Sequence, residues 1–331
     1  MIKIGIIGAG SIVENSHIPV LKSIAKVQIT WISDINELVL RKVAAVNKIR
    51  YIKPDLIHSG IKEVDIVLLA IPIGVRDKYI NIIADEGKAI YIEKPFARNQ
   101  LEHEKICSMF PFHKIACGFQ RRTYVNISLI RNIIQSKIFG DLLQVNLVEC
   151  SYNLKSGGSN SFFSNSELSG GGILIESAIH SLDQLVYSIE PNEIIVHKSD
   201  GILANGQEYH LSSFADMITD YGNVRINLAI SRLYNQPSGI TFEFEHATLH
   251  MINKPSSNIY LVDKNSRNKT AIKIDYSQPF NICVDTSDKA FFVFWKLFFD
   301  AYLTKTINLT SAVTSALTTI WVEKIYRDIY K

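Results

Sequence analysis

The chain has 331 residues, 47% of them hydrophobic and 20% charged, a balance that excludes a disordered, collagen-like or coiled-coil protein. The net charge of +3, from 35 basic and 32 acidic residues, is too small to indicate nucleic acid or an anionic membrane as a partner. A prior of roughly 150 residues per domain predicts two domains, each large enough to bury a core without disulfide or metal support.

The first part of the chain alternates short apolar runs with helical patterns. Predicted strands cover residues 3–7, 27–33, 64–70, 89–92 and 115–119, and predicted helices cover residues 35–47, 77–86 and 101–109. Gly87 follows the second of these helices, where a left-handed cap is expected. Strands that alternate with helices predict an α/β domain over residues 1–120, with a doubly wound parallel sheet and helices on both faces.

The pattern changes near residue 140. Longer strands, several with alternating polarity, are predicted at residues 143–152, 193–197, 209–219, 223–233 and 239–251, and helices at 172–187, 290–303 and 311–330. Strands joined by short turns predict an open, mostly antiparallel sheet. Residues 121–331 are therefore expected to form an α+β domain for substrate binding and oligomerisation, whose C-terminal helices could pack back on the first domain. The aromatic segment 291–299 is expected to be core or interface, not a cofactor site.

The cysteines and the termini indicate the compartment. Cys107, Cys117, Cys150 and Cys283 show no CxxC spacing, which predicts buried thiols in a reducing cytoplasm and neither a disulfide framework nor a metal site. The first residues enter a strand pattern at once, leaving no room for a signal peptide. Residues 306–322 favour an amphipathic helix over a membrane span. A cytoplasmic location is expected.

A glycine-rich turn follows the first predicted strand. In Gly8-Ala9-Gly10-Ser11-Ile12-Val13, the first glycine permits a tight turn and Gly10 lets the backbone approach a pyrophosphate. The helix that follows presents its first amides to the same anion. Val13 stands where the dinucleotide-binding fingerprint has a third glycine, so the motif is degenerate. Its position at the first strand–helix junction predicts dinucleotide binding.

Asp34 ends the second predicted strand, where a carboxylate accepts hydrogen bonds from the adenosine ribose hydroxyls. It would repel a 2′-phosphate, so NAD is favoured over NADP. Asp34 also precedes a helical stretch and is expected to cap it. The two roles are compatible.

Two further strand ends carry candidate residues. Ala70-Ile71-Pro72 ends the third strand, and the proline would turn the chain over the cofactor. Glu93-Lys94-Pro95 ends the fourth strand, at the sheet edge that faces the ligand crevice in such folds. There Lys94 could bind a substrate hydroxyl, with its pKa lowered by desolvation. A surface lysine paired with Glu93 is the alternative.

A second candidate site lies on the predicted helix 172–187, after three glycines. Glu176, His180 and Asp183 have i, i+4, i+7 spacing, which predicts that they share one helix face. His180 could accept a proton near neutral pH, oriented by either carboxylate. A buried structural network and a metal site are the alternatives, the latter weak because no third ligand is evident. The other eight histidines, His17 among them, are expected to be surface or packing residues.

These segments resemble the glucose–fructose oxidoreductase / inositol dehydrogenase / MocA (Gfo/Idh/MocA) family over essentially the whole chain. The resemblance rests on GIIGAGSIVENSHIP at the start, DEGKAIYIEKPFARN at 85–99, CGFQRRT at 117–123 and GGGILIESAIHSLD at 170–183. It implies a Rossmann domain that binds NAD or NADP, and a second domain whose open sheet forms a dimer or tetramer interface. It also implies oxidation or reduction of a hydroxyl or ketone on a sugar, inositol or sugar nucleotide.

The resemblance assigns roles residue by residue. Lys94 matches the lysine held near the nicotinamide and the reacting oxygen, His180 the histidine that moves the proton, and Asp183 the downstream aspartate. Glu176 stands where many members have Asp, and Arg76 where many have His. Ala178 replaces a common Gly, and Gln120 and Arg122 resemble an Asn/Gln and Arg pair at the domain junction.

The expected site has three sets of residues. Catalysis is assigned to Lys94, His180, Glu176 and Asp183, and substrate binding to Lys94, Arg122, Glu176 and His180. Cofactor binding is assigned to Gly8, Gly10, Ser11, Ile12, Asp34, Ala70, Pro72, Glu93, Lys94 and Gln120. The loop 155–169 is expected to shape the substrate pocket, with Arg121, Arg122 and Lys155 as candidates for a sugar nucleotide.

Two alternative functions stay open from the sequence. One is a non-catalytic NAD(P)-binding sensor or scaffold on the same fold. The other is a lyase or epimerase that oxidises and re-reduces its substrate, with no net change in the cofactor.

Overall fold

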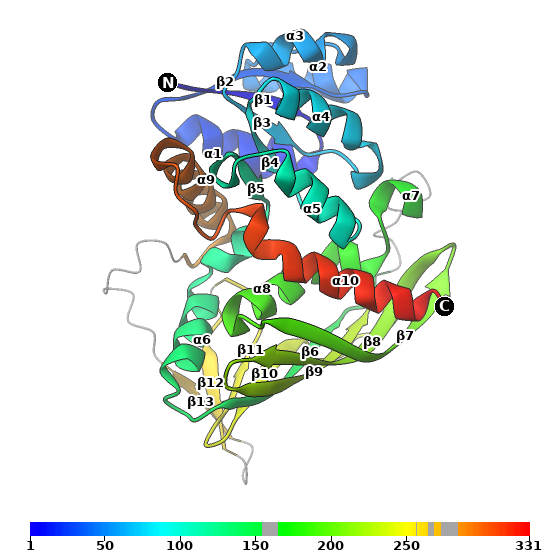
Figure 1. Cartoon of the computed structure of the whole chain (residues 1–331), viewed down its shortest axis with the longest axis vertical. Coiled ribbons are helices and arrows are strands. Elements are labelled where there is room, and N and C mark those ends of the chain that lie inside the picture. The colour runs from blue at the N-terminus through cyan, green and yellow to red at the C-terminus, as the bar shows by residue number, and fades with distance from the viewer. Residues whose placement is uncertain (154–164, 256, 264–267, 273–283) are drawn as a thin grey trace. The chain divides into compact units, whose positions relative to one another are not determined.

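The computed structural model describes residues 1–153, 165–255, 257–263, 268–272 and 284–331 (Figure 1). The chain forms two compact units. The first consists of Met1–Gln120 and Ser287–Ala316, and the second of Arg121–Thr286 and Leu317–Lys331.

The first unit is built on a parallel sheet with strand order β2-β1-β3-β4-β5. Its strands are β1 (Ile2–Ile7), β2 (Val27–Ser33), β3 (Ile66–Leu69), β4 (Ala89–Ile92) and β5 (Ile115–Cys117). Strands β3 and β4 are buried at every residue, as in a sheet covered on both faces. The prediction of a doubly wound parallel sheet is confirmed. The order reverses at β1, so the loops after β1 and β3 border the crevice where such folds bind ligands.

Six helices accompany this sheet: α1 (Ile18–Ser23), α2 (Glu37–Asn47), α3 (Ile57–Lys62), α4 (Asp77–Asp85), α5 (Gln100–Ser108) and α9 (Ser287–Thr304). Gly87 has φ +63° and follows α4, as expected for its cap. Helix α9 lies beside α1 (Figure 1). Its residues Phe291, Phe294, Trp295 and Phe298 join the same buried cluster as Ile4 of β1. The aromatic segment is therefore core, one of the two predicted outcomes.

The second unit contains a sheet with strand order β13-β12-β11-β10-β6-β9-β8-β7. Its strands are β6 (Leu142–Cys150), β7 (Glu193–Ala204), β8 (Gln207–Thr219), β9 (Gly222–Ser231), β10 (Gly239–Phe244), β11 (Thr248–Met251), β12 (Ile259–Val262) and β13 (Lys269–Ile272). The pairing is antiparallel except between β6 and β9. The predicted mostly antiparallel sheet is confirmed. The single strand expected at 239–251 is wrong, because residues 245–247 turn the chain between β10 and β11.

Helices cover one face of this sheet. Figure 1 shows α6 (Val125–Ser136), α8 (Ile179–Ile189) and α10 (Ala316–Ile329) on the same side of the strands, and α7 (Ser166–Ser169) is a single short turn. The opposite face carries a row of aligned, partly exposed side chains from six strands. This row consists of Phe214, Asn227, Asn146, Thr241, His250 and Tyr260.

Two helices depart from regular α geometry. The segments Val13–His17, before α1, and Leu174–Ala178, before α8, are π-helical. The regular helix predicted at 172–187 is therefore wrong in its first turns. Single π turns are rare and occur often at functional sites. The helix predicted at 311–330 likewise begins with a 3₁₀ turn, Ala312–Ser315, and continues as α10.

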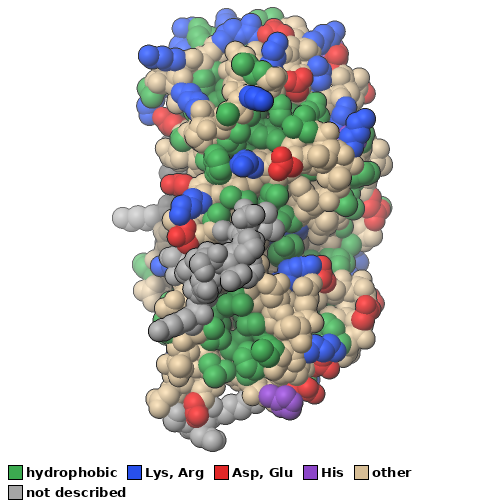
Figure 2. All heavy atoms as spheres, turned by 90° about the vertical axis from the view of Figure 1, so that its left-hand side faces the viewer, with side chains coloured by type: hydrophobic (Ala, Val, Ile, Leu, Met, Phe, Trp, Pro, Cys, Tyr) green, Lys and Arg blue, Asp and Glu red, His purple; other side chains and the backbone are tan. Residues whose placement is uncertain are grey.

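Both signs of charge occur on the face drawn in Figure 2, where Lys and Arg side chains lie among Asp and Glu side chains. Within the described part of the chain, Cys107, Cys117 and Cys150 form no disulfide, and Cys283 lies outside it. None of the helices in the described ranges combines the length and hydropathy needed to cross a membrane.

Candidate functional site

The glycine loop follows β1 and is packed against the end of β3. Gly8 has φ +107°, a conformation that favours glycine, and a Cβ there would lie 2.2 Å from the Ala70 carbonyl oxygen. A Cβ on Gly10, by contrast, would meet nothing within 4 Å. The loop is therefore fixed on its inner side and open on its outer side, where a pyrophosphate could approach the backbone.

The helix after the loop starts at once. The amides of Val13 and Glu14 both donate to the Gly10 carbonyl oxygen at 3.0 Å, and the exposed Ser11 and Ile12 form the first turn. The first amides of any helix lack an acceptor within it, so this turn offers donors to an anion. Val13 is fully buried in the core, which explains how a larger side chain stands in the third position of the fingerprint.

Asp34 fastens this loop from the end of β2. Its Oδ2 accepts a hydrogen bond from the Ala9 amide at 2.7 Å, and its Oδ1 accepts one from the Asn36 amide at 2.8 Å. The predicted cap is wrong: α2 begins at Glu37, and Asn36 caps it by accepting from the Val39 amide at 3.2 Å. Asp34 instead holds the loop, and its side chain is half-buried.

The loops after β3 and β4 are tied together by Arg76. Its Nε donates to the Ile71 carbonyl oxygen at 2.8 Å, and its Nη1 donates to the Pro95 carbonyl oxygen. Arg76 is buried, and burial lowers the pKa of its guanidinium to about 10. The arginine noted in the sequence thus connects the Ala70–Pro72 turn, whose Ala70 amide donates to Ile7, with the Lys94–Pro95 turn.

Glu93 is buried at the end of β4. Its Oε1 lies 2.8 Å from Nε2 of His17, and its Oε2 accepts from the Lys94 amide at 3.2 Å. His17 is fully buried and also receives a hydrogen bond from the Trp295 indole at 3.0 Å. The sequence did not indicate the hydrogen-bond partners of His17, because Glu93 and Trp295 are both remote from it in the chain. The buried Glu93 also disfavours a simple surface ion pair with Lys94.

The three glycines of the second unit make room for a buried anchor. Gly170 caps α7 with φ +81°, and Gly171 has φ +153°. A Cβ on Gly171 would lie 2.0 Å from the Tyr326 hydroxyl, and one on Gly172 would lie 2.4 Å from the Glu208 carbonyl oxygen. The fully buried Glu208 accepts hydrogen bonds from the amides of Gly172 and Leu174 and from the Tyr326 hydroxyl. The helix that carries His180 is therefore fixed at its first residues.

Glu176 and Asp183 bind different arginines. Glu176, in the π-helical segment, forms an ion pair with Arg232, which follows β9. Asp183 accepts from Nη2 and Nε of Arg122 at 2.5 and 2.7 Å, and from the Thr318 hydroxyl at 3.1 Å. Burial raises the pKa of the Asp183 carboxyl, and Arg122 opposes this shift.

The remaining predicted residues are placed as follows. His180 is buried on α8, and Gln120 is buried in the 3₁₀ turn Gln120–Thr123. Pro72 precedes the 3₁₀ turn Ile73–Val75. Residues 154–164, including Lys155 and most of the predicted substrate loop, lie outside the described residues, whereas the end of that loop forms α7. In the described part of the chain, no group of three or more His, Cys, Asp or Glu could hold a metal ion.

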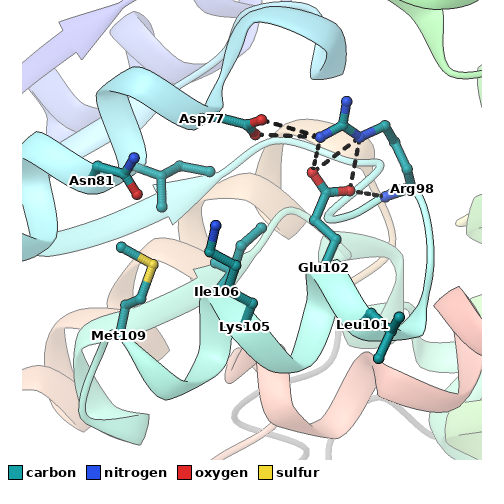
Figure 3. A pocket seen from close by; sticks show the side chains of 9 residues that line it. Asp77, Asn81, Arg98, Leu101, Glu102, Lys105, Ile106 and Met109 are labelled. Carbon is teal, nitrogen blue, oxygen red and sulfur yellow. Dashed lines mark hydrogen bonds and ion pairs between the residues drawn. The ribbon is translucent and has the colours of Figure 1, made fainter.

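A hollow of about 240 Å³ lies between α4 and α5 (Figure 3). Its main charged groups bind one another: Arg98 Nη2 lies 2.5 Å from Oε1 of Glu102 and 3.2 Å from Oδ2 of Asp77. These three side chains are therefore paired with one another, and Lys105 also lines the hollow.

Comparisons with known proteins agree with this geometry. The model of the Gfo/Idh/MocA oxidoreductase family, described by its NAD-binding Rossmann fold, matches residues 2–116, and the model of the C-terminal domain of that family matches residues 127–248. No curated protein matches the chain.

Solved structures resemble the chain over its whole length. A levoglucosan dehydrogenase in complex with NADH is 13% identical, with a TM-score of 0.83 over 99% of this chain and 97% of its own. An aldose-aldose oxidoreductase from Caulobacter crescentus, complexed with glycerol, is 15% identical, with a TM-score of 0.81 over 99% and 97%. A 3-ketoreductase from Actinomadura kijaniata, in complex with NADP and TDP-benzene, is 11% identical, with a TM-score of 0.79 over 99% and 98%. At these identities the likeness establishes the fold.

Proposed function

Because the chain belongs to the Gfo/Idh/MocA family of oxidoreductases with an NAD-binding Rossmann fold, we propose that it transfers a hydride between a nicotinamide and a hydroxyl or ketone carbon of a sugar-type substrate. The observation that carries this proposal is the glycine loop: it is packed on Ala70, held by Asp34 and open at Gly10. The substrate class includes sugars, inositols and sugar nucleotides. Solved structures of similar fold include a levoglucosan dehydrogenase and a 3-ketoreductase bound to TDP-benzene.

The residues present fit NAD. Gly8, Gly10, Ser11 and Ile12 would cradle the pyrophosphate, and Asp34 would accept hydrogen bonds from the ribose hydroxyls and disfavour a 2′-phosphate. Ala70, Pro72, Glu93, Lys94 and Gln120 complete the proposed cofactor site. When bound, the nicotinamide supplies the hydride donor or acceptor.

Side chains of the protein would move the proton of the reacting hydroxyl. Lys94 would hydrogen-bond the reacting oxygen, and His180 would take or return its proton. The support for Lys94 is its place after the buried Glu93, whose Oε2 accepts from the Lys94 amide at 3.2 Å, at the carboxyl edge of a parallel sheet. The support for His180 is its buried position on a helix anchored by Glu208.

Glu176 and Asp183 are each held by an arginine. We propose that Asp183 positions Arg122, since both of its oxygens accept from that guanidinium. Glu176, oriented by its ion pair with Arg232, would contact substrate from the π-helical turn. Effects of these residues on turnover are expected to be smaller than those of Lys94 and His180.

We also propose a cytoplasmic homodimer or homotetramer formed through the open face of the second sheet. The support is the row of partly exposed side chains on that face, in which Phe214 is 37% exposed. A polar row with aromatic members suits a hydrated interface between copies. Among the described residues, Cys107, Cys117 and Cys150 form no disulfide, which suits a reducing compartment.

The first experiment is to identify the cofactor. The purified protein is denatured, the released nucleotide is analysed, and the apo protein is titrated with NADH and NADPH by fluorescence. Preference for NADH supports the role of Asp34, and binding of neither nucleotide overturns the proposal.

A substrate screen then identifies the reaction class. Sugars, inositols and sugar nucleotides are incubated with NAD, and both nicotinamide absorbance and substrate conversion are followed. Net absorbance change supports a dehydrogenase. Conversion without net change supports the lyase or epimerase alternative, and binding without conversion supports the sensor.

A further inference from the structure

Three buried side chains are joined by hydrogen bonds, and the last of them precedes the turn that contains Lys94. The indole Nε1 of Trp295 on α9 donates to Nδ1 of His17 at 3.0 Å, and Nε2 of His17 lies 2.8 Å from Oε1 of Glu93. His17 ends the π-helical segment that begins just after the glycine loop. These hydrogen-bonded side chains therefore connect three elements of the first unit at the carboxyl edge of its sheet.

The chemistry of the indole and the carboxylate determines which atom donates in each of these hydrogen bonds. An indole N–H can only donate, so Nδ1 of His17 must accept and carries no proton. The ring proton then resides on Nε2, which donates to the Glu93 carboxylate. The indole donor on one side and the carboxylate acceptor on the other thus require the same tautomer, and together they orient the His17 ring.

Packing prevents the imidazole from turning away. His17 is fully buried, and its ring makes edge contacts with Tyr91 and Phe291, at centroid distances of 5.4 and 5.0 Å. Tyr91 in turn stacks on the Trp295 indole at 4.4 Å. Rotation of His17 would displace these rings as well as break both of its hydrogen bonds.

The carboxylate is confined on its other side. A Cβ on Gly118, just after β5, would lie 2.9 Å from Oε1 of Glu93, so only glycine leaves the observed space. The second oxygen, Oε2, accepts from the backbone amide of Lys94 at 3.2 Å. The position of Glu93 therefore determines where the Lys94 backbone begins its turn.

We propose that Trp295 and His17 are positioning residues, which fix the Glu93 carboxylate and through it the reactive placement of Lys94. This inference rests on the proposed function, because the role of Lys94 belongs to it. If Trp295 and His17 were purely structural, their replacement would change folding stability alone. If they are positioning residues, their replacement also slows the chemical step, because a misplacement of a reacting group by 1 Å costs about 10²-fold in rate.

The test is Trp295→Phe, which keeps an aromatic ring but removes the indole donor. The matched control is Trp31→Phe, also in the first unit, where the fully buried indole donates to the Gly60 carbonyl oxygen at 2.8 Å. We expect W295F to lower kcat by about 10²-fold, with the KM and the NADH affinity near wild type. W31F should leave kcat unchanged. Equal effects of the two variants on kcat would overturn the proposal.

A rescue series separates hydrogen bonding from packing. His17→Gln supplies an amide N–H for Glu93 and a carbonyl oxygen for Trp295, whereas His17→Leu supplies neither. We expect H17Q to recover a substantial part of the turnover that H17L loses. Equal turnover in these variants, at equal thermal stability, would contradict the positioning role.

Two readouts need no turnover. In protein with ¹⁵N-labelled histidine, the nitrogen shifts of His17, assigned by their loss in H17Q, should report the Nε2–H tautomer in wild type, and the Nδ1 shift should change in W295F, where its donor is removed. The rate of Lys94 acylation, followed by peptide mass spectrometry, should change in W295F and stay at the wild-type value in W31F. If no substrate is turned over, the proposed function fails, and the acylation readout still decides the positioning role: an unchanged rate of Lys94 acylation in W295F would overturn it.

Discussion

The carboxylate of Glu208, at the start of β8, accepts the backbone amide of Gly172 through both oxygens, at 3.1 and 3.0 Å. The same carboxylate accepts from the Leu174 amide at 2.9 Å and from the Tyr326 hydroxyl at 2.9 Å. A negative charge at the first turn of a helix is favourable, since the free amides there carry partial positive charge. A single buried side chain therefore anchors the helix that carries Glu176 and His180.

Replacing this carboxylate by an amide should destabilise the protein. In Glu208→Gln, the new NH₂ group faces N–H and O–H donors, so one buried group loses its partner, at a cost of about 1–3 kcal/mol. Chemical denaturation measures the loss. Tyr326→Phe, which removes one hydrogen bond to the same carboxylate, is the milder comparison. An E208Q protein as stable as wild type would refute the anchoring role.

Acidification should weaken the fold through His103. Burial lowers the pKa of this imidazole from 6.5 to about 4, and its Nε2 lies 3.1 Å from the Ala312 carbonyl oxygen. Between these values the unfolded chain binds a proton that the folded protein does not. Stability is therefore complete above pH 6.5 and falls as the pH is lowered toward 4, by about 3 kcal/mol in total.

The variant His103→Gln isolates this contribution. The amide can still donate to the Ala312 carbonyl oxygen, but it does not titrate. Urea denaturation between pH 7 and 4 should show a smaller loss of stability in H103Q than in wild type. Parallel pH profiles for the two proteins would disprove the assignment to His103.

The charge of Asp34 should set the cofactor preference. Asp34→Asn keeps an oxygen for the Ala9 amide but removes the negative charge that would repel a 2′-phosphate. We expect the ratio of NADPH affinity to NADH affinity to rise about tenfold, which corresponds to 1.4 kcal/mol. Fluorescence titration measures both affinities. Asn36→Ala, which removes only the cap of α2, should leave the ratio unchanged.

Lys94 should matter for chemistry more than for cofactor binding. Lys94→Ala is expected to lower kcat by about 10²–10⁴-fold, the usual contribution of a positioned acid–base group. The NADH affinity should stay near the wild-type value. The half-buried Lys114, which donates to the Gly87 carbonyl oxygen, provides the control Lys114→Ala. Wild-type turnover in K94A would refute the catalytic assignment.

The sequence predicted the first unit closely where local chemistry decides the structure. β2 and β4 match the predicted strands 27–33 and 89–92. In β4 a continuous apolar run, buried at every residue, is bounded by Lys88 and Glu93. The strand pattern also placed Asp34, Glu93 and Lys94 at the carboxyl ends of the sheet. Hydrophobic periodicity is a reliable signal when both faces of a strand are buried.

Other features depend on contacts that one sequence does not display. His17 gained its role from Glu93 and Trp295, which are 76 and 278 residues away. Asn36 caps α2 in place of Asp34, because the Asp34 carboxylate accepts a hydrogen bond from the Ala9 amide in the glycine loop. The turn between β10 and β11 contains no Gly or Pro, so no breaker signal divided the predicted strand.

The π-helical turn before α8 gives this helix one residue more than a regular turn needs. Its backbone hydrogen bonds span one residue more than those of an α-helix, so loss of one residue from Leu174–Ala178 would convert the turn to α geometry. The residues on either side, from the Glu208 anchor to the buried pair of Asp183 with Arg122, would keep their places. The extra residue therefore bulges the helix locally at the turn that carries Glu176. Shortening the chain by one residue here should remove this bulge and preserve the rest of the helix.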